Sequence, residues 1–211
     1  MASERVSIID YGCGNLTSLV EAFKRIGVRA EVTADPSGVH ASEALVLPGV
    51  GNFGHASNVL RHAELDSAIC SAVSSGSYLL GICLGMQLLV NWSEESGEGM
   101  RGLGLIPGVV RSIRGQGVQA RVPHVGWNDV MFADCSHAMA QRILDGGDAY
   151  FVHGYSVVAA DPADVVATTD YEIQLVAAIA RERVWGTQFH PEKSSALGLQ
   201  ILENFIQQVR C

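Results

Sequence analysis

The first 90 residues alternate short, largely apolar runs with longer segments in which apolar residues recur every three or four positions. The apolar runs predict buried strands at residues 6–9, 44–47 and 78–80. Helical periodicity covers residues 16–26 and 65–73, and Gly27 and Gly76 follow these segments where a helix would end. Strands that alternate with helices predict parallel pairing through right-handed crossovers, in an open α/β sheet.

The second half of the chain differs, because apolar runs follow one another with little helix between the last three. Strand candidates cover residues 106–113, 165–169, 175–179 and 184–189, separated by turns rich in Gly, Pro and Asp. We expect these strands to be antiparallel or mixed additions to the same core, followed by an amphipathic helix through residues 199–209. No Pro- or Ser-rich linker divides the chain, so residues 1–211 are expected to form a single domain.

Composition and charge narrow the classes of function. The chain has 211 residues, 48% hydrophobic and 17% charged, as in an ordinary globular protein. Its formal net charge is −8 and its 14 Lys and Arg residues are scattered, so no basic stripe is available to neutralise nucleic-acid phosphates. No apolar run approaches membrane-spanning length, and the N-terminus lacks the longer apolar stretch of a signal peptide. We therefore expect neither a nucleic acid nor a membrane as a partner.

Cysteine usage points to a reducing compartment. Five cysteines are an odd number at irregular spacings, and no C-x-x-C pair indicates a zinc or redox site. They are Cys13, Cys70, Cys83, Cys135 and Cys211. A dinucleotide-binding loop is excluded too, because Thr17 stands where the G-x-G-x-x-G pattern begun by Gly12 and Gly14 needs its third glycine. We expect a cytoplasmic protein.

One of these cysteines lies in the segment Gly81-Ile82-Cys83-Leu84-Gly85, between a strand candidate and a helix expected at 86–90. This is the cysteine form of a nucleophile elbow, a strained turn that lifts the side chain into the open. We expect Cys83 to be exposed and reactive, because the positive end of a helix dipole and its free N–H groups favour thiolate over thiol. Alone, the pattern fits a small buried cysteine in a glycine-rich turn equally well.

The triplet His190-Pro191-Glu192 follows the last strand candidate. It favours a reactive Cys83 over a merely structural one. Residues two apart in extended backbone point to one face, so the imidazole and the carboxylate can lie together. His190 would then take the proton of Cys83 and return it to a leaving amine, while Glu192 orients the imidazole. Alone, such a triplet is more often a surface turn. Together with the elbow it predicts a catalytic triad.

A glycine-rich turn, Leu47-Pro48-Gly49-Val50-Gly51, ends the second strand candidate. Glycines let backbone N–H groups approach a ligand closely. An N–H group at Val50 or Gly51, with the N–H of Leu84, could form an oxyanion hole for an acyl-transfer reaction. A simple glycine turn explains the spacing equally well.

Seven different segments, spread along nearly the whole chain, carry a family resemblance. They are residues 9–15, 47–51, 81–87, 93–95, 123–128, 150–153 and 188–194. Taken together they closely resemble the class I (triad) glutamine amidotransferases, and in particular the glutaminase subunits of imidazole glycerol phosphate synthase. The elbow and the H-P-E segment mark the class, whereas P-H-x-G-W-N and Y-F-V-H point to these subunits.

The resemblance implies a flavodoxin-like α/β fold with a mostly parallel core, which hydrolyses L-glutamine and passes ammonia to a (β/α)8-barrel synthase in a heterodimer. It implies no metal and no organic cofactor. The barrel would use the ammonia to form imidazole glycerol phosphate and an aminoimidazole carboxamide ribotide. By residue, it implies a triad of Cys83, His190 and Glu192; glutamine binding by Gly51, Gln87, Glu95, His153, Gly154 and Tyr155; and a partner interface at Trp127, Tyr150 and Lys193.

One position departs from the family pattern. Gly154 stands where the family commonly places a small hydroxyl residue, so only the backbone could contact glutamine there. Two other functions stay open from the sequence. Similar amidotransferase subunits serve barrel partners that amidate surface-polysaccharide sugars, and an α/β fold can also serve as a non-catalytic regulatory module.

Overall fold

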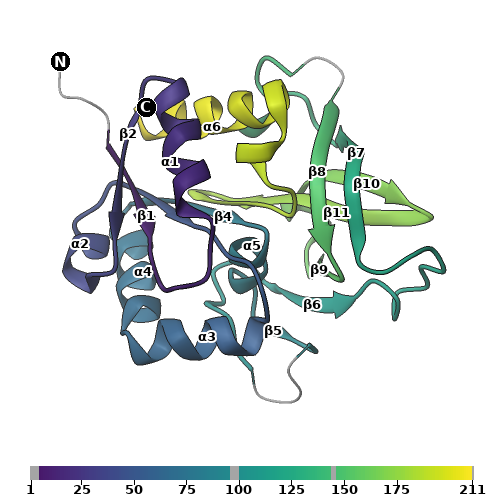
Figure 1. Cartoon of the computed structure of the whole chain (residues 1–211), viewed down its shortest axis with the longest axis horizontal. Helices are drawn as coiled ribbons and strands as arrows, with labels where there is room; N and C mark the ends of the chain where they lie inside the picture. Colours follow the sequence, from purple (N-terminus) through teal and green to yellow (C-terminus); the bar gives the residue numbers. More distant parts are fainter. Residues whose placement is uncertain (1–4, 96–99, 144–145, 211) are drawn as a thin grey trace.

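The computed structural model describes residues 5–95, 100–143 and 146–210, and its centre is a nine-stranded mixed sheet (Figure 1). The strand order is β2-β1-β3-β4-β12-β11-β10-β7-β8. In that order the strands are β2 (Arg29–Thr33), β1 (Arg5–Ile9), β3 (Ala44–Leu47), β4 (Tyr78–Ile82), β12 (Val184–Thr187), β11 (Ile173–Arg181), β10 (Val165–Tyr171), β7 (His124–Phe132) and β8 (Gly147–His153).

The pairing confirms the two halves that the apolar pattern predicts. The strands from β2 to β12 pair in parallel, so the alternation of strands and helices does produce an open α/β sheet. From β12 onward the neighbours pair antiparallel, through β11, β10, β7 and β8. The carboxyl ends of β3, β4 and β12 therefore meet at one edge, where ligands bind in open α/β sheets.

Helices cover both faces of the parallel half. On one face lie α1 (Leu16–Arg25) and α6 (Ser195–Val209), at the top of Figure 1. On the other face are α2 (Pro36–His40), α3 (Phe53–His62), α4 (Leu65–Ser74) and α5 (Leu84–Leu88). Two cores result. Val46 of β3 packs into the core under α1 and α6, whereas Leu45 and Leu47 pack into the core under α3 and α4, as the alternation of a strand requires.

The strand expected in residues 106–113 is present and joins the same core, but in a second, three-stranded sheet. There β6 (Gly108–Ser112) pairs with β5 (Trp92–Ser93) and β9 (Tyr155–Ala159) in a sheet of its own, not in the large sheet. Apolar spacing predicts a strand but not its partner, because the partner is chosen by the path of β9 after Gly154. Within the described residues there are also three short 3-10 helices: η1 (Ala138–Ala140), η2 (Pro162–Asp164) and η3 (Pro191–Lys193).

The predicted helix ends have the backbone geometry that glycine permits. Gly27 has φ +77°, and the N–H groups of Gly27 and Val28 donate to the carbonyls of Lys24 and Phe23 at 3.0 Å each. Gly76 has φ +107° two residues after α4. The last helix begins at Ser195, four residues before its first predicted residue.

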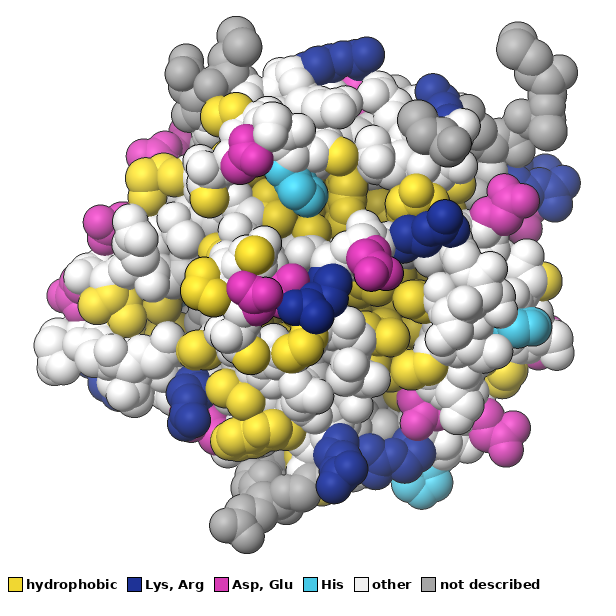
Figure 2. Space-filling model, turned by 180° about the vertical axis from the view of Figure 1, so that it is seen from behind, with side chains coloured by type: hydrophobic (Ala, Val, Ile, Leu, Met, Phe, Trp, Pro, Cys, Tyr) yellow, Lys and Arg dark blue, Asp and Glu magenta, His cyan; other side chains and the backbone are white. Residues whose placement is uncertain are grey.

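The surface is mixed in charge. Figure 2 shows basic and acidic side chains interspersed over the rear face, with apolar side chains between them. In the described ranges, no helix combines the length and the apolar character that a membrane crossing requires.

We predict that Gly198→Ala will destabilise the protein by about 1–3 kcal/mol. A Cβ at this position would overlap the carbonyl oxygen of Pro191, so α6 or the Pro191 turn would have to move. Urea unfolding measures the change. Gly115→Ala is the matched control, because its Cβ would lie 3.4 Å from the nearest atom; we expect a change within about 0.5 kcal/mol. Equal stability of Gly198→Ala and wild type would contradict the close packing.

Candidate active site

The turn after β4 holds a cysteine in a strained backbone conformation. Cys83 directly precedes α5 and has φ +56° and ψ −109°, a region that residues with a Cβ rarely adopt. Its N–H donates to the Thr187 carbonyl at 2.7 Å, which ties the turn to the end of β12. The sharp strand-to-helix turn that the sequence predicts is therefore present.

Two glycines make this turn possible, because other backbone passes very close to them. A Cβ on Gly85 would overlap the carbonyl oxygen of Leu47 at the end of β3. A Cβ on Gly81 would lie 2.7 Å from the carbonyl oxygen of Gly85. Neither neighbour is the movable end of a side chain, so a larger residue at either position would displace the turn.

Cys83 is buried, which corrects the expectation that it would be exposed. Only 6% of its surface is accessible, and its side chain borders a cavity of about 320 Å³. The lining residues are Val50, Gly51, Cys83, Leu84, Gln87, Glu95, Pro123, Val152, His153, Gly154 and Tyr155. Every residue that the sequence nominates for the oxyanion hole or for glutamine binding is among them. The elbow thus presents the thiol to a partly open cavity, which is bordered by the segments that follow β3 and β8.

His190 and Glu192 lie on the turn after β12, next to Cys83. His190 Nδ1 is 2.8 Å from a Glu192 carboxylate oxygen, and only 4% and 2% of the two side chains are exposed. Nδ1 donates, because an ionised carboxylate only accepts. The other nitrogen, Nε2, is buried and makes no hydrogen bond of ordinary geometry to a described residue. It is therefore the ring nitrogen left to exchange a proton with Cys83.

The surroundings of His190 favour its protonated form. Burial lowers the pKa of the imidazole, but hydrogen bonds and negative charge from Cys83 and Glu192 raise it more, to about 9. The contact with Cys83 is thus close enough to act electrostatically although its geometry is loose, as in many enzymes before substrate binds. An imidazole that holds its proton at pH 7 is the neighbour that stabilises a thiolate.

The glycine-rich loop after β3 lies against this turn. Leu84 N–H donates to the Gly49 carbonyl at 3.3 Å, so this nominated oxyanion donor is engaged by the loop. The Tyr11 hydroxyl donates to the Pro48 carbonyl at 2.8 Å, and burial raises the pKa of that hydroxyl so far that it stays protonated. Val50, in contrast, is exposed and borders the cavity.

Gln87 and Glu95 reach the cavity from α5 and from the segment after β5. Gln87 Nε2 donates to the Tyr155 carbonyl at 3.1 Å and to Gln188 Oε1 at 3.0 Å, so only its amide oxygen remains for a ligand. One Glu95 carboxylate oxygen accepts the N–H of Phe53 at 2.8 Å. An amide oxygen and a carboxylate are both suited to binding an ammonium group.

His153 lines the cavity, and both of its ring nitrogens make hydrogen bonds within the protein. Its Nδ1 lies 2.9 Å from the Tyr155 carbonyl and must donate, so its Nε2 accepts from His124 Nδ1 at 3.0 Å. His124 Nε2 accepts in turn from the Asn128 amide at 3.3 Å. Burial lowers the pKa of both imidazoles to about 4, so both are neutral at pH 7. The side chain of His153 therefore positions the backbone of Tyr155.

The site of Gly154, where the family pattern has a small hydroxyl residue, has room for a side chain. A Cβ there would be in ordinary contact with Val122, at 3.6 Å, and Gly154 is not among the glycines with positive φ. Packing therefore does not require glycine at this position.

The residues nominated for a partner interface form one group on β7, β8 and the turn after β12. The rings of Trp127 and Tyr150 meet edge to face with centroids 6.2 Å apart, and Lys193 Nζ lies 5.6 Å from the Tyr150 ring centre. Trp127 is 54% exposed. The Tyr150 carbonyl accepts the N–H of His190 at 3.1 Å, so this group touches the backbone of the candidate base.

Gln188 is a neighbour of Cys83 that the sequence reasoning did not single out. Its Nε2 lies 3.7 Å from Cys83 Sγ, and the residue is fully buried. The signal was present: the two-residue spacing that pairs His190 with Glu192 also places Gln188 on the face of His190.

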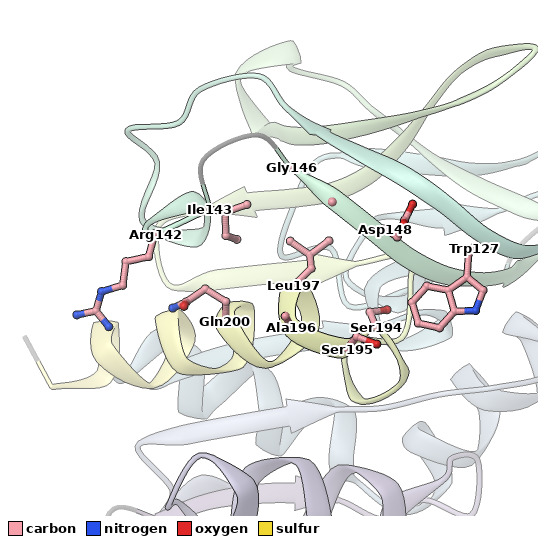
Figure 3. A pocket seen from close by; sticks show the side chains of 11 residues that line it. Trp127, Arg142, Ile143, Gly146, Asp148, Ser194, Ser195, Ala196, Leu197 and Gln200 are labelled. Atoms are coloured by element: carbon pink, nitrogen blue, oxygen red, sulfur yellow. The ribbon is translucent and has the colours of Figure 1, made fainter.

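A larger hollow lies elsewhere on the described part of the molecule. It is a groove of about 600 Å³ between β8 and the first turn of α6, and Trp127, Asp148 and Leu197 border it (Figure 3). Its described lining contains no cysteine and no histidine. We therefore place the chemistry in the smaller cavity at Cys83.

The described cysteines are all free thiols, and Cys211 lies outside the described residues. No cluster of three or more His, Cys, Asp or Glu side chains within the described ranges is arranged to hold a metal ion.

Comparison with known proteins covers almost the entire chain. Residues 7–209 match the family model for glutamine amidotransferase class-I. The imidazole glycerol phosphate synthase subunit HisH of Geobacillus sp. (strain WCH70) is 43% identical over 203 residues, which is 95% of each chain. The subunit of the same name from Moorella thermoacetica is 44% identical over 205 residues, 97% of this chain and 95% of the relative.

A solved structure described as a glutamine amidotransferase has the same fold, with a TM-score of 0.76 and 19% identity, over 98% of this chain and 99% of that chain. The resemblance drawn from seven sequence segments is thus confirmed at the level of the family. The chain belongs to the class I glutamine amidotransferases and, among them, to the HisH subunits of imidazole glycerol phosphate synthase.

Proposed function

We propose that this chain hydrolyses L-glutamine with Cys83 as nucleophile, His190 as proton carrier and Glu192 as the group that orients His190. The observation that carries the proposal is the arrangement of a buried imidazole between a carboxylate and the thiol at the floor of one cavity. The ammonia passes to a (β/α)8-barrel synthase subunit, and the pair serves histidine biosynthesis. The chain acts as one domain, in the cytoplasm, without a metal or an organic cofactor.

In the first half of the reaction, the Cys83 thiolate attacks the carboxamide carbon of glutamine. The C–N bond breaks as His190 gives its proton to the leaving nitrogen, so the products are a thioester on Cys83 and free ammonia. The proton is available because the raised pKa of His190 keeps the imidazole protonated at neutral pH. Glu192 stabilises that positive charge and fixes the ring through Nδ1.

In the second half, the neutral imidazole takes a proton from water, and the water oxygen attacks the thioester carbon. The C–S bond breaks, glutamate leaves, and the thiolate and the imidazolium are restored. Glutamine is held meanwhile by the cavity lining. The Glu95 carboxylate and the amide oxygen of Gln87 receive the substrate ammonium, and the backbone of residues 153–155 and of Gly51 forms the surrounding wall.

The barrel partner docks on the outer face of β7 and β8. That face exposes Trp127, and its apolar character extends along both strands to Val125, Met131 and Val152, which are 56%, 43% and 37% exposed. Val125 pairs with Val152, and Trp127 pairs with Tyr150, so the apolar residues are adjacent across the strands. Val152 also lines the cavity, so ammonia leaves the cavity next to this face.

Docking activates the site through the glycine-rich loop. In this conformation the Gly49 carbonyl occupies the Leu84 N–H. Rotation of the peptide between Gly49 and Val50 would withdraw that carbonyl and turn the Val50 N–H toward the cavity, so a single rotation supplies both oxyanion donors. One missing donor typically costs about 10²–10³ in rate, so the isolated chain is a poor glutaminase. The partner favours the active orientation through differential contacts with the two states.

We predict that Cys83→Ala abolishes glutamine hydrolysis but still supports ammonia-dependent synthesis by the barrel partner. The substitution removes the sulfur nucleophile and leaves the fold and docking face in place. Glutamate release and product formation with ammonium salt, measured on the same complex, separate the two activities. Hydrolysis by Cys83→Ala at the wild-type rate would refute the nucleophile.

His190→Ala should impair turnover more than Glu192→Gln. We expect a loss of about 10³-fold or more in kcat for His190→Ala and a smaller loss for Glu192→Gln, because the amide oxygen can still accept the Nδ1–H. Steady-state glutaminase assays of the complex measure both. Both variants should retain the partner's ammonia-dependent activity, and a comparable loss of that activity in both would indicate a structural role instead.

Addition of a barrel partner with its acceptor ligand should raise the glutaminase rate strongly, and Trp127→Ala should weaken this activation or the docking while leaving the basal rate nearly intact. A buried interface tryptophan often contributes about 2 kcal/mol or more, so docking should weaken about thirtyfold or more. Trp92→Ala is the matched control, because Trp92 is 39% exposed on β5, in the other sheet. Full activity of the isolated chain would refute the activation mechanism.

A further inference from the structure

A buried amide beside the proposed nucleophile has no role in the proposed reaction. Gln188 is fully buried, and its Nε2 is 3.7 Å from Cys83 Sγ. Its own N–H donates to the Ala177 carbonyl at 2.8 Å, so the backbone that carries it is fixed to β11. Gln188 and His190 are two residues apart, and both interact with Cys83, so two donor side chains of one segment act on the thiol.

The orientation of the Gln188 amide follows from its neighbours. The Gln87 amide contacts the Tyr155 carbonyl at 3.1 Å, and a carbonyl only accepts, so the contacting atom of Gln87 is its nitrogen. The same nitrogen lies 3.0 Å from Gln188, so the contacting atom of Gln188 is its oxygen. The amide nitrogen of Gln188 is therefore the atom that faces the sulfur.

We propose that Gln188 is a positioning residue that donates a hydrogen bond to the thiolate form of Cys83, with Gln87 holding the Gln188 amide in the donating orientation. The proposal rests on the proposed function, since it concerns the nucleophile of that reaction. Hydrogen bonds to ionised acceptors are about twice as strong as those between neutral groups. The N–H group thus stabilises the thiolate more than the thiol or the thioester, which aids both formation of the nucleophile and its release in the second half of the reaction.

In this arrangement Gln87 has two roles. It borders the cavity that receives glutamine and also holds the amide that contacts the sulfur. Substrate contact with the Gln87 oxygen is thereby linked by one residue to the hydrogen bond at Sγ.

Other titratable groups around the sulfur stay unchanged when Gln188 is replaced. They are His190 and Glu192 from the turn after β12, Tyr11 from the loop after β1, and Glu95, His153 and Tyr155 around the cavity. A change that follows replacement of Gln188 therefore reports on its amide.

The test measures the rate at which iodoacetamide alkylates Cys83 as a function of pH, in the full chain, by mass spectrometry of the peptide that contains Cys83. Only the thiolate reacts, so the midpoint of the profile reports the thiolate equilibrium. For Gln188→Met, which has similar length and no N–H donor, we expect the midpoint to rise by about one pH unit. This corresponds to about tenfold slower alkylation at a fixed pH below both midpoints.

The matched control is Asn204→Leu. Asn204 is also a buried amide, and its nitrogen donates to the carbonyls of Met139 and Gln141 at 2.8 and 2.7 Å, but it does not line the cavity. It should lose stability and keep the wild-type midpoint. An unchanged midpoint in Gln188→Met, or an equal shift in Asn204→Leu, would overturn the proposal.

If Gln188→Met does not fold, Gln87→Met decides by the same criterion. It leaves Gln188 in place but removes the donor that sets its orientation, so we expect a smaller shift in the same direction, and an unchanged midpoint overturns the proposal. The outcome is separable from the proposed function. An active Cys83→Ala variant would refute the nucleophile, whereas an unchanged midpoint in an enzyme that needs Cys83 would refute only the role of Gln188.

Discussion

The contact between the Cys83 turn and the end of β3 is the constraint on which the rest of the site depends. Gly85 lies so close to the Leu47 carbonyl that no side chain fits between them. This contact holds Cys83 in its strained conformation, with φ +56°, at the edge where β3, β4 and β12 end together. It also brings the glycine-rich loop that follows β3 onto the N–H of Leu84. The proposed nucleophile and the loop that would complete an oxyanion hole are therefore held by one packing contact.

Hydrogen bonds connect this edge of the sheet with the exposed strands β7 and β8. On one side, the Tyr150 carbonyl binds the N–H of His190, and Ser194 Oγ bonds both the Tyr150 N–H and the His190 carbonyl. On the other side, the neutral pair His124 and His153 positions the Tyr155 carbonyl. That carbonyl also accepts from the amide chain that ends at the sulfur. A protein docked on these strands would thus be one hydrogen bond from the backbone of His190 and four hydrogen bonds from Sγ of Cys83.

Local pattern was sufficient for most strands of the parallel half of the fold, whereas the glutamine-binding residues of the cavity lining came from the family resemblance. The strand and helix periods up to residue 80, the glycine stops and the strained turn are consequences of neighbouring residues, and all are present. Local pattern left α3 unassigned although its buried residues Phe53, Ala56 and Leu60 recur at helical spacing. Pattern did not reveal β2, because that strand has only partly buried or exposed residues, RAEVT. Nor could it assign β6 to the small sheet, since the choice of partner depends on the path of a strand some 50 residues later.

The sequence by itself determined the family, the parallel half of the mixed sheet and the identity of the candidate triad, because these depend on residue type and on motifs of short spacing. Only the tertiary structure decided that Cys83 is buried in a cavity, that the Leu84 N–H is engaged by Gly49, and that Gln188 faces the sulfur. Each of these joins segments far apart in the chain: the turn after β3, the turn after β4 and the end of β12. The distances between such segments are set by the packing of helices on both faces of the sheet, so they cannot be predicted from the spacing of residues within one segment.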